Sequence, residues 1–265
     1  LRDYFRSYVA IARRYDMGLI VDTATWRASA DWVQRRGLSD DESARIHARS
    51  VALLEEVRAE ADPVPLVISG AIGPRGDGYV PGAMMSVRHA EAYHQAQADA
   101  LAGTAADMLC AMTINYVEEA IGIAYAARRA AMPLAMSFTV ETDGRLPTGQ
   151  SLATAIDLVD TATSGYPLYY MVNCAHPTHF AHLLDPSQSW VRRIKGLRAN
   201  ASCMSHAELN ESPVLDEGNP GELGRTYAEL RQRLPQLTVL GGCCGTDQRH
   251  VEAIAAACAG TFAPA

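Results

Sequence analysis

Short apolar runs alternate with amphipathic stretches along the whole chain, and this alternation constrains the fold more than any other feature. Uninterrupted apolar runs of about four to eight residues are typical of buried parallel strands, and longer stretches with an apolar stripe are typical of helices. The apolar runs predict seven strands, at residues 19–21, 66–69, 107–114, 133–140, 168–174, 194–201 and 237–241.

Helices are predicted between these strands. Ser39 and Glu42 form a capping box, which marks the start of a long helix that ends before Pro63. Ser86 and Thr246 are candidate caps of two further helices. The amphipathic stretches predict helices at residues 2–15, 40–61, 87–102, 116–131, 152–164, 178–184, 222–234 and 247–259, and long loops at 70–82 and 202–220.

The order of these elements indicates the fold class. Strands that alternate with helices form a parallel sheet, and no shift in composition divides the chain, so we expect a single domain over residues 1–265. A TIM (β/α)8 barrel has eight strands, each followed by a helix. Because seven strands are predicted and the first element is a helix, we expect a TIM barrel whose first strand lies before Leu1. A doubly wound open sheet is the alternative, but no glycine-rich fingerprint follows the early strands.

Charge and composition exclude several classes of function. The 265 residues include 23 Lys and Arg against 30 Asp and Glu, and the resulting charge of −7 argues against nonspecific nucleic-acid binding. No apolar run approaches the roughly 18 residues of a membrane span, and the charged start at residues 1–4 does not resemble a signal peptide. We therefore expect no membrane partner. A homo-oligomer is compatible with this composition, which does not fix the oligomeric state.

The six cysteines indicate a reducing compartment. They are too few for a disulfide scaffold in a chain of this length. Two of them, Cys243 and Cys244, are adjacent, and neighbouring residues rarely form a disulfide without strain. We therefore expect reduced thiols and a cytoplasmic protein.

Three of the cysteines lie at the ends of predicted strands. Cys174 ends one strand, and Cys243 and Cys244 follow the last one. The active site of a TIM barrel lies at this edge, and Zn²⁺ in catalytic sites takes three protein ligands, with thiolates among the preferred donors. A single cysteine at a strand end is more often a small buried apolar residue. The adjacent pair fits that interpretation less well, because neighbouring side chains of an extended segment face opposite sides. The residues alone leave both interpretations open.

Several segments resemble the homocysteine S-methyltransferase family. Residues 241–246, Gly-Gly-Cys-Cys-Gly-Thr, and the pair Asn173-Cys174 are similar to the zinc-binding motifs of that family. Residues 23–29, Thr-Ala-Thr-Trp-Arg-Ala-Ser, resemble its stretch after the second barrel strand. Residues 137–139, Ser-Phe-Thr, and the nearby Asp143-Gly144 resemble the segment after the fifth. The resemblance covers essentially the whole chain. It implies a TIM barrel in which Cys174, Cys243 and Cys244 hold Zn²⁺.

The sequence also departs from the family pattern. Family members begin with a strand that ends in Asp-Gly-Gly, and this segment is absent here. Ala24 replaces the usual Asn, and Met112 stands where many members carry Glu. We therefore expect an altered or incomplete amino-acid pocket, and weak or no activity from this chain without a restored N-terminal strand.

The resemblance also implies an activity. It implies a zinc-dependent enzyme that moves a methyl group from a small onium donor, S-methylmethionine or a betaine, to the thiol of homocysteine and forms methionine. Both partners are small molecules. At the predicted rim, Glu141 is expected to be catalytic, because related betaine-using enzymes carry a Glu at a matching place. Asp22, Thr23 and Asn173 are expected to bind substrate.

Other roles for these residues stay open at this point. Glu141 is alternatively a solvated loop carboxylate, and Asp22 a structural or capping residue. His176 and His179 lie near Cys174 and belong to a common class of zinc ligand, but three cysteines already supply the expected set.

Three other functions compete with this one. A barrel enzyme of another kind would bind phosphate at the last helix, but such a site needs backbone N–H groups and no thiols. A noncatalytic or incomplete zinc-binding barrel is the second alternative, since an open barrel exposes strand edges. A barrel enzyme that acts on a different thiol is the third.

Overall fold

The computed structural model describes residues 1–261. Seven parallel strands form one sheet, and their order in the sheet follows their order in the chain. The strands are β1 (Leu19–Asp22), β2 (Leu66–Ile72), β3 (Met108–Ile114), β4 (Leu134–Phe138), β5 (Tyr169–Asn173), β6 (Ile194–Ala199) and β7 (Val239–Gly242).

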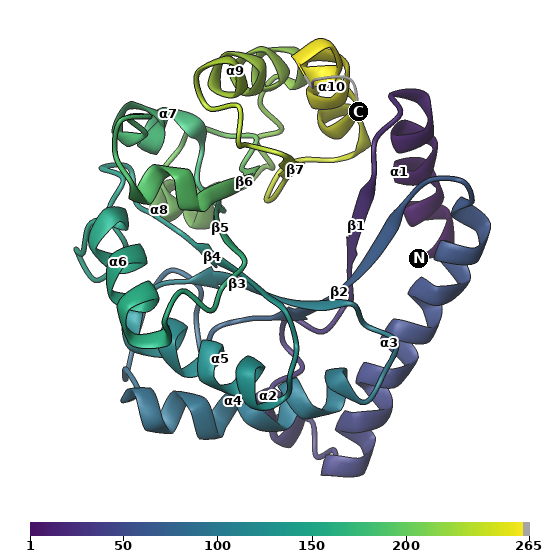
Figure 1. The fold of residues 1–265 in the computed structure, drawn as a ribbon, viewed down its shortest axis with the longest axis vertical. Helices are drawn as coiled ribbons and strands as arrows, with labels where there is room; N and C mark the ends of the chain where they lie inside the picture. Colours follow the sequence, from purple (N-terminus) through teal and green to yellow (C-terminus); the bar gives the residue numbers. More distant parts are fainter. Residues whose placement is uncertain (262–265) are drawn as a thin grey trace.

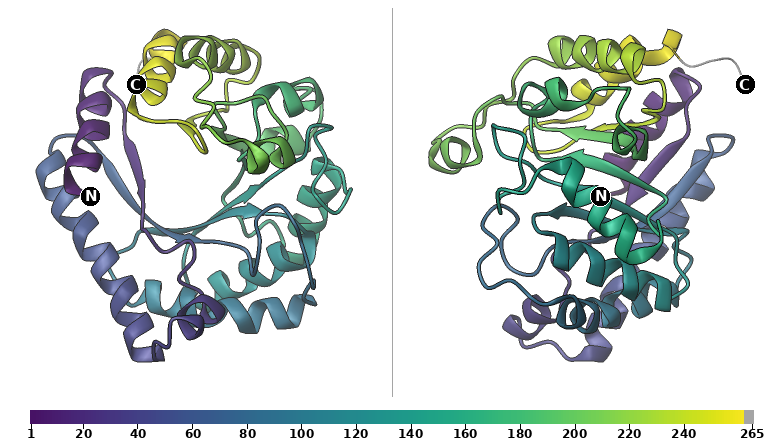
Figure 2. Two further views of the ribbon diagram at one scale, coloured as in Figure 1. Left: turned by 180° about the vertical axis from the view of Figure 1, so that it is seen from behind. Right: turned by 60° about the vertical axis from the view of Figure 1, so that its left-hand side comes forward.

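Helices surround the sheet on its outer side (Figure 1). Seen from behind, the strands again form the inner layer and the helices the outer one (Figure 2, left). The helices are α1 (Arg2–Arg14), α2 (Ala30–Arg35), α3 (Asp40–Ala61), α4 (Val87–Ala102), α5 (Val117–Arg129), α6 (Leu152–Thr163), α7 (Pro177–Phe180), α8 (His206–Glu211), α9 (Pro220–Arg233) and α10 (Gln248–Cys258), with 3₁₀ turns at Ala181–Leu183, Trp190–Arg193 and Ala259–Thr261.

The sheet curls into a TIM-type barrel that lacks one of the eight strands. Within residues 1–261 no backbone ladder joins β7 to β1, and we call this place the seam. The outer layer does close across it, because α1 packs against α10 and Arg14 pairs with Glu252. The predicted fold class is therefore confirmed, and the open seam in residues 1–261 is consistent with the predicted missing strand. The expected domain runs to residue 265, and its last four residues lie outside the described part.

Most of the apolar core lies between the strands and the helices. A second, smaller cluster fills the inside of the barrel with Met108, Cys110, Ala135 and Met171. Cys258 is a packing residue, since its side chain is fully buried in the outer core. The inner cluster forms an apolar layer inside the barrel.

The structure corrects three local predictions. Strand β2 continues to Ile72, because Gly70 lacks a Cβ that would lie only 2.8 Å from a methyl carbon of Leu101. The predicted loop at 202–220 contains α8, which begins with a capping box of Ser205 and Glu208. Helix α2 was not predicted at all.

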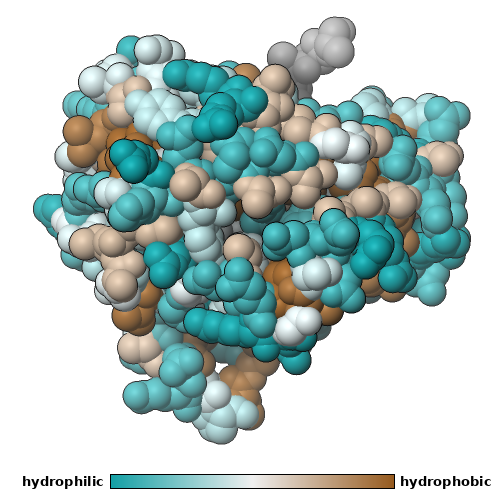
Figure 3. Space-filling model, turned by 90° about the horizontal axis from the view of Figure 1, so that it is seen from below, coloured by the Kyte–Doolittle hydropathy of each residue, from teal (hydrophilic) through white to brown (hydrophobic). Residues whose placement is uncertain are grey.

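The surface adds two facts. Hydrophilic and hydrophobic residues are interspersed over the face shown in Figure 3. Among the described helices, none is long and apolar enough to cross a membrane.

Candidate functional site

Three cysteine side chains meet at the ends of β5 and β7. Cys174 comes directly after β5, and Cys243 and Cys244 come directly after β7. Their sulfur atoms all lie within 4.8 Å of one another. In the described residues, no other group of three or more His, Cys, Asp or Glu side chains is close enough together to hold a metal. The three cysteines therefore gather at one rim of the barrel, as the sequence predicts.

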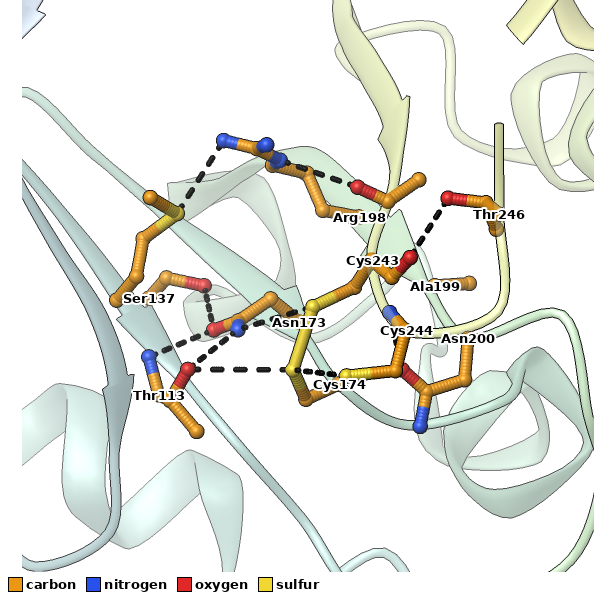
Figure 4. The surroundings of a disulfide bond; sticks show 12 residues. Thr113, Ser137, Asn173, Cys174, Arg198, Ala199, Asn200, Cys243, Cys244 and Thr246 are labelled. Atoms are coloured by element: carbon orange, nitrogen blue, oxygen red, sulfur yellow. Dashed lines mark hydrogen bonds between the residues drawn. A yellow bond between two sulfur atoms is a disulfide. The ribbon is translucent and has the colours of Figure 1, made fainter. Parts of the chain in front are cut away.

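Two of the three cysteines are joined to each other in the structure. A disulfide joins Cys174 to Cys243, and the Sγ atom of Cys244 lies 3.8 Å from that of Cys174 (Figure 4). Cys244 is free and exposed. A metal takes thiolate ligands, so reduction of this disulfide must precede the binding of a metal by all three sulfurs.

The run Gly-Gly-Cys-Cys-Gly-Thr folds as it does for local reasons. Gly242 has no room for a side chain, since a Cβ there would collide with Thr246 Oγ1. Gly245 has φ +77°, a conformation that glycine adopts without strain. The hydroxyl of Thr246 donates to the Cys243 carbonyl oxygen at 2.7 Å. These bonds turn the chain sharply, so that two adjacent thiols reach the same cluster.

Neighbouring β6 fixes this turn from the side. The Cys243 N–H donates to the carbonyl oxygen of Ala199 at 2.7 Å, and the Cys244 N–H donates to Asn200 Oδ1 at 3.1 Å. The prediction that Thr246 caps the last helix is wrong, because its hydroxyl donates to the Cys243 carbonyl oxygen within the turn. Asp247 caps α10 instead and accepts from the Arg249 N–H.

Two residues beside the cluster hold an unusual backbone conformation. Cys174 has φ +54° and Thr113 has φ +63°. For a β-branched residue such as Thr this region is rare, and such outliers concentrate at functional sites. The Thr113 hydroxyl lies 4.0 Å from the Cys174 sulfur.

Asn173 holds Thr113 and the cysteine loops in place. Its Oδ1 accepts from the Thr113 N–H at 2.9 Å and from the Ser137 hydroxyl at 2.6 Å. Its Nδ2 donates to Thr113 Oγ1 at 2.8 Å and lies 3.9 Å from the Cys243 sulfur. The side chain is buried, and both ends of its amide have partners in the protein. Its predicted contact with substrate stays a prediction.

The other predicted substrate residues lie at the end of β1. Thr23 is buried, accepts from the Ala71 N–H at 2.9 Å and lies 2.6 Å from the Thr25 hydroxyl. Asp22 forms an ion pair with Arg198 of β6. That pair spans the seam inside the barrel, and Arg198 was not predicted from the sequence.

Glu141 lies on the rim, where it meets the loop at 202–220. Its carboxylate is 3.2 Å from Nδ1 of His206, whose Nε2 lies 2.5 Å from the Cys174 carbonyl oxygen. The His206 ring stacks on Tyr79 with the centroids 4.0 Å apart. Tyr79 in turn places its hydroxyl 3.7 Å from the Cys244 sulfur. The two loops that the sequence analysis marked therefore meet over the thiols, through two residues that it did not single out.

Burial raises the pKa of Tyr79 above its ordinary value. The phenol therefore keeps its proton at neutral pH, so its hydroxyl can donate to the Cys244 sulfur.

The two histidines near Cys174 do not join the cluster. The Nδ1 atom of His176 accepts from the Thr178 N–H and caps α7. The Nε2 atom of His179 lies 2.9 Å from the Cys203 carbonyl oxygen. Within residues 1–261 the cluster therefore consists of cysteines and includes no histidine.

Comparison with known proteins agrees with this geometry. A sequence model of the family described as homocysteine S-methyltransferase matches residues 1–258. The chain belongs to this family. It is therefore a methyltransferase, and the resemblance drawn from residues 241–246 is confirmed.

One curated relative is Homocysteine S-methyltransferase 3 of Arabidopsis thaliana. It is 23% identical over 263 residues, which cover 89% of this chain and 75% of the relative. The match therefore extends over most of both proteins.

Solved structures share the fold. The homocysteine methyltransferase MmuM from Escherichia coli superposes in its metallated form with a TM-score of 0.71 at 19% identity, covering 96% of this chain and 83% of that one. Its oxidized form gives 0.71 at 21% identity over the same shares, and its apo form gives 0.67 at 19% identity over 97% and 84%. These likenesses support the barrel architecture.

Proposed function

We propose that this homocysteine S-methyltransferase family member is zinc-dependent, and that it moves a methyl group from a small onium donor to the thiol of homocysteine, forming methionine. The donor is S-methylmethionine or a betaine. The observation that carries the proposal is the gathering of Cys174, Cys243 and Cys244 at one rim. Three thiolates leave the fourth position of a tetrahedral metal open for a substrate.

The spacing of one sulfur pair, Cys174 and Cys244, matches that of two zinc ligands. Two sulfur ligands of a tetrahedral zinc lie about 3.8 Å apart when each Zn–S bond is about 2.3 Å long. The sulfurs of Cys174 and Cys244 are 3.8 Å apart. Zinc bound by these residues would lower the pKa of a substrate thiol, so that the thiol reacts as a thiolate at neutral pH.

The protein's own residues would position the reactants and exclude water. Asn173 Nδ2 lies 3.9 Å from the Cys243 sulfur, and Asn200 Oδ1 accepts from the Cys244 N–H, so both asparagines support the cysteine turn after β7. Tyr79 and His206 stack across the rim and cover one side of the cluster. Alignment of the two reactants contributes a large share of the rate of a bimolecular reaction.

A cavity beside Cys244 supports a small onium donor. It has a volume of about 340 Å³ and opens between Cys244 and the loop at 202–220. Leu209, Pro213 and Leu215 give it apolar walls, and Asp216 adds a carboxylate. The hydrogen bond from Ser202 lowers the pKa of Asp216, so the group is charged at neutral pH. Apolar walls with one carboxylate suit a donor that carries methyl groups on a cationic centre.

The remaining site assignments are part of this proposal. Glu141 would be catalytic at the rim through its contact with His206, and Asp22, Thr23 and Asn173 would contact the thiol substrate. All four lie at or near the carboxyl ends of the strands, where barrel enzymes keep their reacting groups.

We also propose that residues 1–265 form one barrel domain that works in the cytoplasm. The matched family spans nearly the whole chain, and thiolate ligands require a reducing compartment. Self-association stays a prediction, which sedimentation of the reduced protein would test.

Metal analysis combined with a donor screen tests the function. The reduced protein is expected to hold about one zinc per chain. With homocysteine as acceptor, methionine is expected from at least one of S-methylmethionine and betaine. If zinc is bound and several donors give no methionine, the acceptor is a different thiol or the barrel is noncatalytic.

A further inference from the structure

Arg198 contacts both arms of the thiol cluster. It pairs with Asn173 on one side and with Gly241 on the other. Its carbonyl oxygen accepts from the Cys174 N–H at 3.2 Å, and its Nε donates to the Gly242 carbonyl oxygen at 3.4 Å. The residue is therefore fixed directly beside the metal ligands on either strand.

The guanidinium group reaches into the barrel. Its Nη1 forms the ion pair with Asp22 of β1 and lies 3.2 Å from the sulfur of Met112 on β3. The side chain is about one-quarter exposed, at 28%. Within the described residues, Nη2 makes no hydrogen bond to the protein. Nη1 is thus paired with Asp22, and Nη2 keeps its N–H donors free.

Among residues 1–261, Asp22 is the one charged side chain that forms an ion pair with this guanidinium. Cys110 and Tyr227 also lie near it, but burial raises the pKa of both above their ordinary values, so both are neutral. Met112 is a neutral thioether. An anion that entered from the rim would therefore meet a partly buried cation with only one competing carboxylate.

We propose that Arg198 binds a carboxylate of the thiol substrate, so that the site selects thiols that carry a carboxylate at the end remote from the sulfur. Arginine binds carboxylates through paired N–H donors, and such bonds are stronger away from water. Asp22 beside it suits the ammonium group of an amino acid. The inference rests on the proposed function and names the part of homocysteine that the barrel recognises.

The competing role is structural, because the Arg198–Asp22 pair also bridges the seam. A merely structural role would affect all thiols equally. The test therefore compares three thiols of matched length with the wild-type protein: homocysteine, 4-mercaptobutanoate, which lacks the ammonium group, and 3-aminopropane-1-thiol, which lacks the carboxylate.

For the zinc-loaded wild type, we expect kcat/KM to be about 100-fold lower with 3-aminopropane-1-thiol, which lacks the carboxylate, than with homocysteine. Most of this change should lie in KM, because a partly buried charge that loses its partner weakens binding strongly. Loss of the ammonium is expected to have a smaller effect. In Arg198→Met the preference of 4-mercaptobutanoate over 3-aminopropane-1-thiol should fall to within about threefold. Arg198→Lys should fall between the two, because lysine keeps the charge without the paired donors.

A double variant tests the proposal if Arg198→Met fails to fold. A binding measurement without metal tests it if the proposed methyl transfer is not observed. Asp22→Asn with Arg198→Met removes both charges, so neither is left buried alone, and it should lose the same preference. Calorimetry on the metal-free, reduced wild type should show that 4-(methylthio)butanoate binds more tightly than 3-(methylthio)propylamine. This order tests Arg198 even if no donor transfers a methyl group. Equal binding of the two thioethers, or an equal loss for all three thiols in Arg198→Met, would overturn the proposal.

Discussion

The ends of β5, β6 and β7 differ from the seam in how the chain holds them together. At their carboxyl ends a backbone ladder pairs Asn173 with Arg198 and Arg198 with Gly241, and the cysteines follow directly. At the seam the described residues form no ladder between β7 and β1. The contacts there are the Arg198–Asp22 pair inside the barrel and α1 against α10 outside.

This difference separates two tasks of the site. The three cysteines that would hold a metal follow strands that are joined by backbone hydrogen bonds, and these bonds keep the sulfur positions fixed. Arg198 and Asp22, which would recognise the rest of the substrate, are joined only through their side chains across the seam. Regions with fewer backbone bonds open more readily, so changes at the thiols should abolish chemistry, and changes at the seam should alter substrate binding and stability.

The largest effect is expected at the thiol side. Cys244→Ala leaves two thiolates, which hold zinc far less tightly than three. We expect bound zinc to fall from about one per chain to below about one-tenth, and methyl transfer to fall by at least about 10³-fold with the loss of the metal. Cys203→Ser is the matched control, because Cys203 is exposed and lies outside the cluster. Full zinc occupancy in Cys244→Ala, measured by elemental analysis, would refute the three-thiolate site.

The next effect concerns the seam. An N-terminal extension that supplies a strand between β7 and β1 should raise kcat/KM by about 10²-fold, because a misplacement of about 1 Å in a bound substrate costs that much. Both proteins would be assayed side by side with homocysteine and the same donors. Equal rates would show that the unpaired edge does not limit activity.

A third change tests how the hydrogen bonds of Asn173 support the thiol cluster. Asn173→Ala leaves the Thr113 N–H and the Ser137 hydroxyl without their partner. Buried groups that lose a partner cost about 1–3 kcal/mol each, so we expect a loss of about 3 kcal/mol in the free energy of unfolding, measured with urea. Ser137→Ala removes a single bond and should cost less than half of this. Equal losses in the two variants would contradict a central role for Asn173.

The smallest effect lies outside the seam. Glu252→Gln removes the ion pair with Arg14 that links α10 to α1. Both side chains are well exposed, and such pairs contribute about 0.5 kcal/mol. The loss should shrink further in high salt. A loss above about 2 kcal/mol, well beyond the range of exposed pairs, would mean that the outer helices, and not the inner pair, hold the seam together.

The sequence predicted what local patterns encode. The capping box of Ser39 and Glu42 starts α3 as expected, because both bonds form within one turn of chain. The run at residues 241–246 also depends on local causes, namely the space at Gly242 and the positive φ of Gly245. The seven strands followed from apolar runs, since strands covered on both faces need little else.

Contacts between distant segments were not predictable in this way. Tyr79 and His206 are 127 positions apart in the numbering, and nothing in either loop marks them as a stacked pair. The pairing of Arg198 with Asp22 arises only when the barrel curls and brings β6 opposite β1. The choice of Asp247 over Thr246 as a cap depended on a competing bond to the Cys243 carbonyl oxygen.

X-ray absorption at the zinc edge of the reduced protein tests the central claim most directly, that the thiols of β5 and β7 hold one metal with a position left for a substrate thiol. We expect three sulfur ligands at about 2.3 Å and one lighter ligand. Addition of homocysteine should replace the lighter ligand with a fourth sulfur. Fewer than three sulfurs before addition, or no change after it, would contradict the account.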